Sequence, residues 1–225
     1  MNFCIPDSRA NNSSSWFLML MTMLLVSAVL AEGLGLNDKI INWVGKKYGV
    51  EAKQRAENWR SLLETELILE KDKLTRVNNF FNEIPYRDDF ENWDNKDYWA
   101  TPIEMIGVNA ADCEDYAIAK YFSLRDMGVS SEKLRITYVK AIEINQAHMV
   151  LAYYQKPDAI PLILDNLKPD IRSADKRNDL VPVYSFNAEG LWLAVNRGSG
   201  KRLGNASKVK LWSDLREKMK KELSQ

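Results

Sequence analysis

Histidine and cysteine are almost absent from this sequence. Its 225 residues include one histidine, His148, and two cysteines, Cys4 and Cys113. Zinc sites are usually built from several Cys or His ligands, so these counts exclude the usual zinc ligand sets. If the chain uses imidazole chemistry near neutral pH, it must use His148.

Net charge is also absent, because 31 Lys and Arg residues balance 31 Asp and Glu residues. A surface that binds nucleic acid needs an excess of basic residues to neutralise phosphates, so no nucleic-acid ligand is expected. The chain also lacks a P-loop and the glycine fingerprint of dinucleotide-binding folds, and we interpret Gly198-Ser199-Gly200 as a turn. Charge balance does not exclude protein partners.

The first 31 residues differ in composition from the rest. Trp16 to Ala31 is an apolar run interrupted only by Thr22 and Ser27, and it ends in small residues. This run is short for a membrane span and has the length of a signal-peptide core, so we interpret residues 1–31 as a signal peptide or, alternatively, an uncleaved anchor. Either outcome places the remaining single domain, residues 32–225, outside the cytoplasm.

Removal of the leader would also remove Cys4 and leave Cys113 without an internal disulfide partner. A lone cysteine in an exported protein is intermolecular, free and reactive, or buried and inert. The cysteine count alone favours the buried, inert state, and the residues around Cys113 reverse that preference.

Hydrophobic periodicity predicts an α+β domain, with helices first and an antiparallel sheet after them. Period-3.6 patterns predict helices at about Asn37–Gly49, Glu51–Leu69, Lys71–Glu83, Asp112–Gly128 and Leu211–Leu223. Alternating patterns predict strands at Leu134–Ile142, Gln146–Tyr154, Ile160–Asn166, Val181–Phe186 and Leu191–Asn196. The segment from Tyr86 to Val108 fits neither period, and long irregular segments in compact domains are more often functional than idle.

The segment Asn109–Tyr116 places Cys113 among carboxylates at the start of the fourth predicted helix. Asp112 or Asn109 is a candidate N-cap, and with Asp112 as N-cap Asp115 falls at the third helical position, a relative of the capping box. The helix terminus favours a thiolate, whereas the neighbouring acids Asp112, Glu114 and Asp115 oppose one. The acids could therefore be helix caps only, or oxygen ligands of a divalent cation that offsets their charge.

Cys113, His148 and Asp165 occur in an order that can assemble a nucleophile, its base and the group that orients the base. His148 lies in one predicted strand and Asp165 ends the apolar run of the next. A short connection between antiparallel strands predicts that these two residues are neighbours. The alternatives are a structural histidine and a solvated acid at the rim of the sheet.

These residues resemble the bacterial transglutaminase-like cysteine proteinases, and most of all their LapG-type periplasmic adhesin-processing branch. The resemblance rests on four stretches, which are Tyr98–Glu104, Asp112–Ala117, Ala147–Leu151 and Leu164–Leu167. It implies a papain/transglutaminase-like core in which the amino-terminal helices and the nucleophile helix pack on the antiparallel sheet. The implied catalytic residues are Cys113, His148 and Asp165.

The same resemblance implies calcium as a cofactor, with Asp112 and Glu114 as ligands and Asp115 as a further candidate. It implies endoproteolysis of a large surface adhesin near its amino terminus, which would release the adhesin and promote biofilm dispersal. A further implied partner is the periplasmic domain of an inner-membrane receptor that senses cyclic di-GMP. For the oxyanion we expect the Cys113 N–H and the Trp99 indole as donors. The alternatives are amide transfer by a transglutaminase and an inactive binding module on the same fold.

Overall fold

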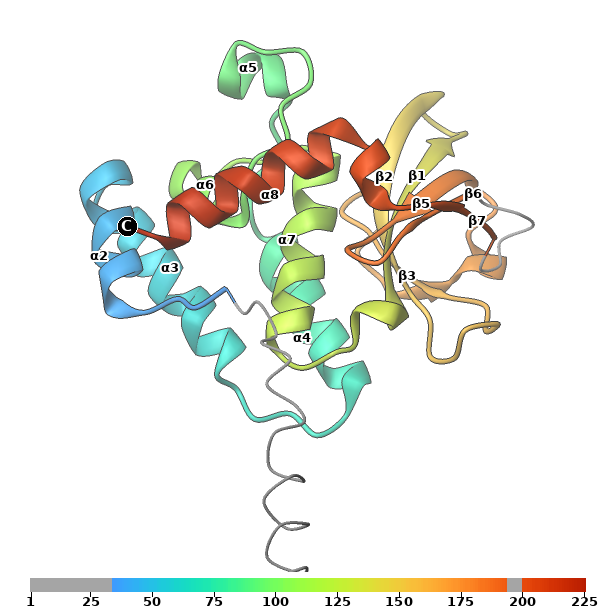
Figure 1. Cartoon of the computed structure of the whole chain (residues 1–225), viewed down its shortest axis with the longest axis horizontal. Helices are drawn as coiled ribbons and strands as arrows, with labels where there is room; N and C mark the ends of the chain where they lie inside the picture. Colours follow the sequence, from blue (N-terminus) through green and yellow to red (C-terminus); the bar gives the residue numbers. More distant parts are fainter. Residues whose placement is uncertain (1–33, 194–199) are drawn as a thin grey trace, which may run out of the picture. The chain divides into compact units, whose positions relative to one another are not determined.

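The computed structural model describes residues 34–193 and 200–225, which form helices packed on an antiparallel sheet (Figure 1). The α+β class predicted from the sequence is therefore confirmed. The expected leader, residues 1–31, and Cys4 lie outside the described residues. Within the described part of the chain, no helix is both long and apolar enough to span a membrane.

Three helices open the domain close to their predicted positions. They are α2 (Asp38–Tyr48), α3 (Val50–Leu63) and α4 (Glu70–Asn82). The Asn37 side chain caps α2, and Gly49 ends it with a φ of 98°, a conformation that suits glycine. The second helix ends at Leu63 rather than the expected Leu69. Ile68 and Leu69 are 97% and 62% exposed, so this apolar stretch has no core to pack against.

The segment expected to be irregular contains two short helices, α5 (Asp89–Trp93) and α6 (Pro102–Val108). The α6 helix starts with a capping box, in which the Thr101 side chain accepts the Glu104 N–H and Glu104 accepts the Thr101 N–H. Pro102 occupies the first helical position, where its missing N–H costs nothing. The prediction was wrong here because a seven-residue helix is too short to show a period.

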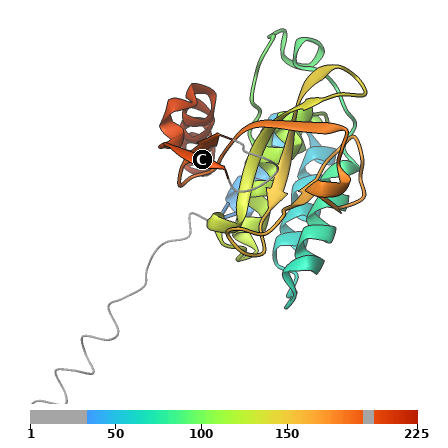
Figure 2. The ribbon, with the colours of Figure 1, turned by 90° about the vertical axis from the view of Figure 1, so that its right-hand side faces the viewer.

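The central helix is α7 (Cys113–Asp126), which packs against α4 and α6 on one side and against β1 and β2 on the other. In Figure 2 the sheet side faces the viewer and the amino-terminal helices lie behind the strands. Asp115 accepts the Asp112 N–H at 3.4 Å, which is one half of the predicted capping box. The helix ends one residue before Met127, and Gly128 follows with a φ of 83°.

The described residues form a seven-stranded sheet in the order β4-β3-β2-β1-β5-β6-β7, with every neighbouring pair antiparallel. Its strands are β1 (Leu134–Ala141), β2 (Gln146–Tyr153), β3 (Leu162–Leu164), β4 (Arg172–Ser173), β5 (Leu180–Phe186), β6 (Leu191–Leu193) and β7 (Lys201–Gly204). The two edge strands were not predicted, because β4 has only two residues and the four residues of β7 include a single large apolar one, Leu203, so neither shows hydrophobic alternation. Residues 194–196 of the expected fifth strand lie outside the described residues.

Strand β2 is buried on both faces. Met149, Leu151 and Tyr153 join the main core beside α7, whereas Val150 and Ala152 join a smaller apolar cluster on the opposite face of the sheet. The chain then returns over the helices as α8 (Lys210–Leu223), where Lys218 Nζ binds Trp99 O at 2.7 Å and Glu104 Oε2 at 3.0 Å. This return ties the carboxyl terminus to the segment that precedes α7.

Candidate active site and metal centre

Cys113 is the first residue of α7, half-buried and free of any disulfide. Its thiol donates to Glu114 Oε2 at 3.0 Å. The next acid, Asp115, accepts the Ala100 N–H at 2.7 Å, and this bond joins the segment that carries Trp99 to the first turn of α7. The cysteine therefore sits at a helix start whose position is fixed from the neighbouring segment.

The surroundings of the Cys113 thiol oppose its ionisation. Burial raises the pKa of the thiol well above its ordinary value, and the carboxylates of Glu114 and Asp112 raise it further. A hydrogen bond with the Met149 backbone acts in the opposite direction. The conflict expected from the sequence is thus present, and the helix terminus does not overcome it unaided.

His148 and Asp165 form a buried pair with 2.7 Å between His148 Nε2 and Asp165 Oδ1. They are 3% and 1% exposed. Pairing of Leu151 with Leu164 sets the register of β2 against β3 and brings the first half of β2 beside the residues that follow β3. In the neutral imidazole with a proton on Nε2, that nitrogen donates to Asp165 and Nδ1 is left as the acceptor.

Asp165 is held as an anion despite its burial. Burial alone would raise the pKa of its carboxyl group, but hydrogen bonds from His148, Arg177 and the Leu167 N–H hold this pKa below its ordinary value. The residues expected to act together thus come from α7, β2 and the turn after β3. The Met149 backbone bonded to Cys113 belongs to the residue next to His148.

Arg177 completes this group and was not foreseen from the sequence. It is 2% exposed, and its Nη2 donates to Asp165 Oδ2 at 2.6 Å. No spacing signal points to it, because it lies in a polar loop and its contact with Asp165 depends on the fold of that loop.

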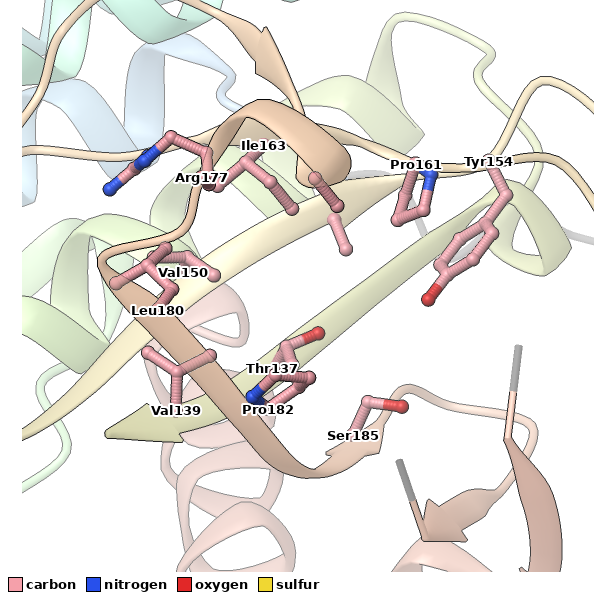
Figure 3. A pocket seen from close by; sticks show the side chains of 12 residues that line it. Thr137, Val139, Val150, Tyr154, Pro161, Ile163, Arg177, Leu180, Pro182 and Ser185 are labelled. Atoms are coloured by element: carbon pink, nitrogen blue, oxygen red, sulfur yellow. The ribbon is translucent and has the colours of Figure 1, made fainter. Parts of the chain in front are cut away.

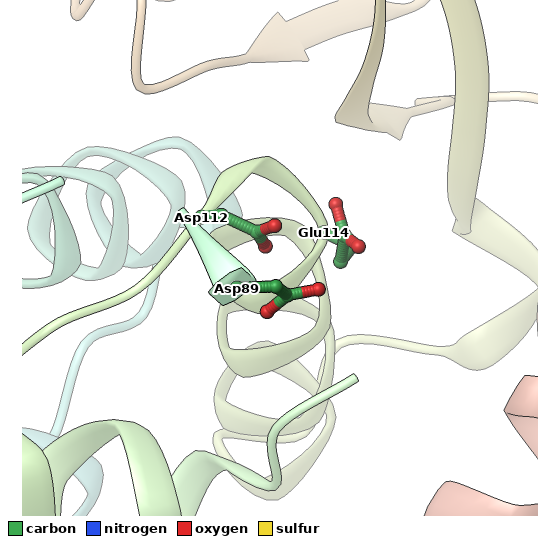
Figure 4. Close-up of side chains that lie close together, drawn as sticks. All are labelled: Asp89, Asp112 and Glu114. Atoms are coloured by element: carbon green, nitrogen blue, oxygen red, sulfur yellow. The ribbon is translucent and has the colours of Figure 1, made fainter. Parts of the chain in front are cut away.

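A cluster of carboxylates lies beside the start of α7, where Asp89, Asp112 and Glu114 converge (Figure 4). Ligand oxygens from the three residues lie within 4.8 Å of one another. Asp112 and Glu114 were predicted as metal ligands, but Asp115 is not part of this cluster. Both Asp115 oxygens are occupied by backbone N–H groups, those of Ala100 and Asp112.

Asp89 was missed because it lies in the first turn of α5, far from Asp112 along the chain. The only signal available in the sequence was the acidic composition of the Tyr86–Val108 segment. One Asp89 oxygen accepts the Tyr98 N–H, which holds the side chain in place.

The three acids repel one another strongly. Burial and the carboxylates of Glu114 and Asp115 raise the pKa of Asp112 to about 10, and burial raises the pKa of Asp89 to about 6. Asp112 Oδ1 is buried without a hydrogen-bond partner. Converging carboxylate oxygens, one of them unsatisfied, fit a hard divalent cation such as calcium, which takes oxygen ligands.

Trp99, expected as an oxyanion donor, is 5% exposed and stacks on Phe186 with ring centroids 5.6 Å apart. The Ala100–Asp115 bond places the backbone next to Trp99 at the start of α7. The donor role of its indole stays a prediction.

The family profile for the bacterial transglutaminase-like cysteine proteinases (BTLCP) matches residues 37–199. The chain belongs to this family. A search of curated proteins found no match. As a family member, the chain is also similar to three solved structures of LapG from Legionella pneumophila.

The EGTA-treated LapG structure is 41% identical with a TM-score of 0.73, and the match covers 83% of this chain and 97% of that one. A second LapG structure is 40% identical with a TM-score of 0.71, at the same coverage. The calcium-bound LapG structure is 42% identical with a TM-score of 0.70, and the match covers 80% of this chain and 98% of that one. At this identity the likeness extends over nearly the whole domain of the relative.

Proposed function

We propose that this family member is a calcium-dependent cysteine endoprotease of the periplasm, with Cys113 as nucleophile, His148 as base and Asp165 as the group that orients the base. The observation that carries the proposal is the buried His148–Asp165 pair, in which Nε2 and Oδ1 are 2.7 Å apart. The residue after His148 in the strand, Met149, forms a backbone hydrogen bond with Cys113. A thiol, an imidazole and a carboxylate in this relation constitute the machinery of acyl transfer.

In the proposed reaction the Cys113 thiolate attacks the scissile carbonyl while His148 holds the thiol proton. The oxyanion is met by the Cys113 backbone N–H and by the Trp99 indole, and one such donor is worth roughly 3 kcal/mol in comparable enzymes. His148 then protonates the leaving amine, and water releases the acyl-enzyme. Asp165 keeps the imidazole in the tautomer that presents Nδ1 as the base.

For the cofactor we propose that Asp89, Asp112 and Glu114 hold calcium. A bound cation would neutralise carboxylates that now raise the pKa of Cys113. The chain's own residues would then keep the start of α7 in position, because Asp112 and Glu114 flank Cys113 directly in the sequence. A calcium chelator should therefore lower activity, and unchanged activity in calcium-depleted protein would count against the metal.

For the substrate we propose a large surface adhesin, cut near its amino terminus to release it and promote biofilm dispersal. For the regulator we propose the periplasmic domain of an inner-membrane receptor that senses cyclic di-GMP. Support comes from the similarity to LapG and from the export signal interpreted in residues 1–31.

The test incubates purified protein with secreted adhesin fragments, with and without calcium, and sequences the new amino termini. Cys113→Ala and His148→Ala should abolish cleavage while circular dichroism stays native. Asp165→Asn should lower the rate by orders of magnitude, whereas the control Asp170→Asn removes an exposed carboxylate nearby and should not. Near-normal turnover in either alanine variant would sink the assignment.

The same assay separates the two rival functions. A product linked to a lysine amine, in place of new termini, would indicate amide transfer by a transglutaminase. An inactive binding module would give neither product, and its Cys113 would react slowly with iodoacetamide near neutral pH.

A further inference from the structure

The Asp165 carboxylate is bound on both of its oxygens. Oδ1 accepts from His148 and from the Leu167 N–H at 3.0 Å, and Oδ2 accepts from Arg177. A carboxylate bound in this way cannot rotate without breaking a charge-assisted bond in a buried site. Arg177 supplies the bond to the oxygen that does not face His148.

Arg177 is itself clamped by Asp179. Its Nε donates to Asp179 Oδ1 at 3.0 Å and its Nη2 to Asp179 Oδ2 at 2.9 Å, a two-pronged contact. Asp179 is further paired with Lys168 at 3.2 Å. A guanidinium held in this way is preorganised, so little conformational entropy is lost in binding Asp165.

An apolar cavity lies on the other side of the Arg177 side chain (Figure 3). Its walls include Val150, Ile163 and Leu180, and in Figure 3 the guanidinium nitrogens point away from the cavity while the carbon chain borders it. These residues belong to the smaller apolar cluster of the sheet. The Arg177–Asp165 pair therefore lies in low-dielectric surroundings, where an unpaired carboxylate would be costly.

We infer that Arg177 is a positioning residue, which keeps Asp165 ionised and aimed at His148 Nε2, with Asp179 holding Arg177 in place. The effect of Arg177 on catalysis rests on the proposed function, whereas its hydrogen bond to Asp165 does not depend on that function. Arg177 is buried and bonds Asp165, so it acts on His148 through Asp165.

Two other polar residues, Lys120 and Asn82, interact with Asp165. Lys120, in α7, acts on Asp165 electrostatically, and its Nζ donates to Asn82 Oδ1 at 2.7 Å. Asn82, in α4, donates to the Asp165 backbone oxygen at 2.9 Å. Neither is hydrogen-bonded to the Asp165 carboxylate oxygens, so Arg177 holds the carboxylate more directly than either.

The test compares Arg177→Gln with the wild type, both loaded with calcium. We expect kcat to fall at least about tenfold, with KM little changed. The fall should not exceed the roughly 10⁴-fold loss that follows substitution of an orienting aspartate in a comparable triad. The acid limb of the pH profile should move to higher pH, because burial would then raise the pKa of Asp165 with less opposition. The matched control is Arg172→Gln, an exposed arginine of the same region that pairs with Asp170.

A second readout needs no substrate. The chain has one histidine, so every imidazole signal in a nitrogen-15 NMR spectrum belongs to His148. The wild type should show the Nε2–H tautomer above the acid limb, and Arg177→Gln should show a mixture of tautomers. A merely structural Arg177 would lower the melting temperature and leave both the tautomer and the acid limb unchanged, which would overturn the inference.

Two variants keep the test decisive if Arg177→Gln does not fold. Arg177→Lys retains the positive charge but loses the planar guanidinium, and Asp179→Asn weakens the ion pair that holds Arg177. Both variants should therefore shift the acid limb to higher pH, by less than Arg177→Gln does. No shift in either would reject the positioning role. A tautomer change in a protein whose wild type cleaves nothing would uphold the geometry of the inference and refute the proposed function instead.

Discussion

Cys113, the sole thiol in the described part of the chain, lies in surroundings that favour a thiolate in one respect and oppose it in others. A helix terminus lowers the pKa of a thiol, but burial and the adjacent Glu114 raise the pKa of Cys113 by more. The His148–Asp165 pair and a cation at the acidic cluster are the two features that could reverse this balance. We therefore expect the reactivity of Cys113 to depend on the His148–Asp165 pair and on a bound cation, in addition to the helix terminus.

A second ionisable residue of α7 has an equally unusual position. Lys120 is 1% exposed, and burial lowers the pKa of its amine to about 7, an effect that Asp165 partly opposes. In the unfolded chain the same amine titrates near its ordinary value of 10.5. Between these two pH values the unfolded state binds more protons than the folded state, so stability should rise with pH in that window.

We therefore expect the free energy of unfolding of the wild type, measured relative to Lys120→Met, to increase from pH 7 to pH 9.5. At about 1.4 kcal/mol per pH unit the gain should be on the order of 3 kcal/mol. Urea titrations of both proteins at the two pH values give this difference. Lys71→Met, at an exposed position of α4, serves as the control, and parallel pH dependences for wild type and Lys120→Met would contradict the expectation.

At the scale of elements, α6 joins the stretch from Tyr98 to Thr101 to the start of α7. Thr101 is fully buried, and its hydroxyl oxygen accepts the Glu104 N–H at 3.0 Å. Glu104 in turn accepts from Lys218 of α8 and from Tyr98 at 2.7 Å. This short helix cap thus links the Tyr98–Glu104 stretch to α8, which is distant in the sequence.

Thr101→Val should destabilise the domain by about 1–2 kcal/mol, because it keeps the side-chain volume and leaves a buried backbone N–H without its acceptor. Chemical denaturation measures this loss. Thr75→Val is the matched control, since its hydroxyl is exposed and bonds within α4 to Lys71 O. Equal losses in the two variants would show that the buried cap carries no special weight.

At the scale of the whole molecule, α7 is the element through which the amino-terminal helices and the sheet are joined. The acidic cluster adds a link at one end of this helix, because Asp89 belongs to α5 while Asp112 and Glu114 belong to the start of α7. A ligand that binds only the folded state stabilises the whole domain by mass action. Calcium should therefore affect global unfolding as well as activity.

We expect calcium to raise the melting temperature of the wild type and EGTA to reverse the gain. At a hundredfold excess over the dissociation constant the stabilisation is about 2.7 kcal/mol. Asp89→Asn should lose most of this gain. Asp94→Asn removes a carboxylate of the same segment at a left-handed position that asparagine tolerates, so it should keep the full response. An Asp89→Asn protein that responds like the wild type would exclude Asp89 as a ligand.

The sequence by itself determined the class of the fold, because helical and alternating periods depend only on local residue order. It also determined Cys113 at a helix start, and it predicted that His148 and Asp165 would meet, since two strands joined by a short connection pair antiparallel. Short elements such as α6 and β4 could not be predicted from it, because they are too short for a helical or alternating pattern to repeat.

Only the tertiary structure decided which acids gather and what holds Asp165. Asp89 reaches Asp112 and Glu114 because α5 folds back over the start of α7, and Asp115 is withdrawn because the Ala100 and Asp112 N–H groups occupy its oxygens. Arg177 meets Asp165 through a polar loop whose conformation has no local signature. These contacts join residues distant along the chain, and burial of their charged groups is costly unless the charges are paired or neutralised, a balance that no local pattern records.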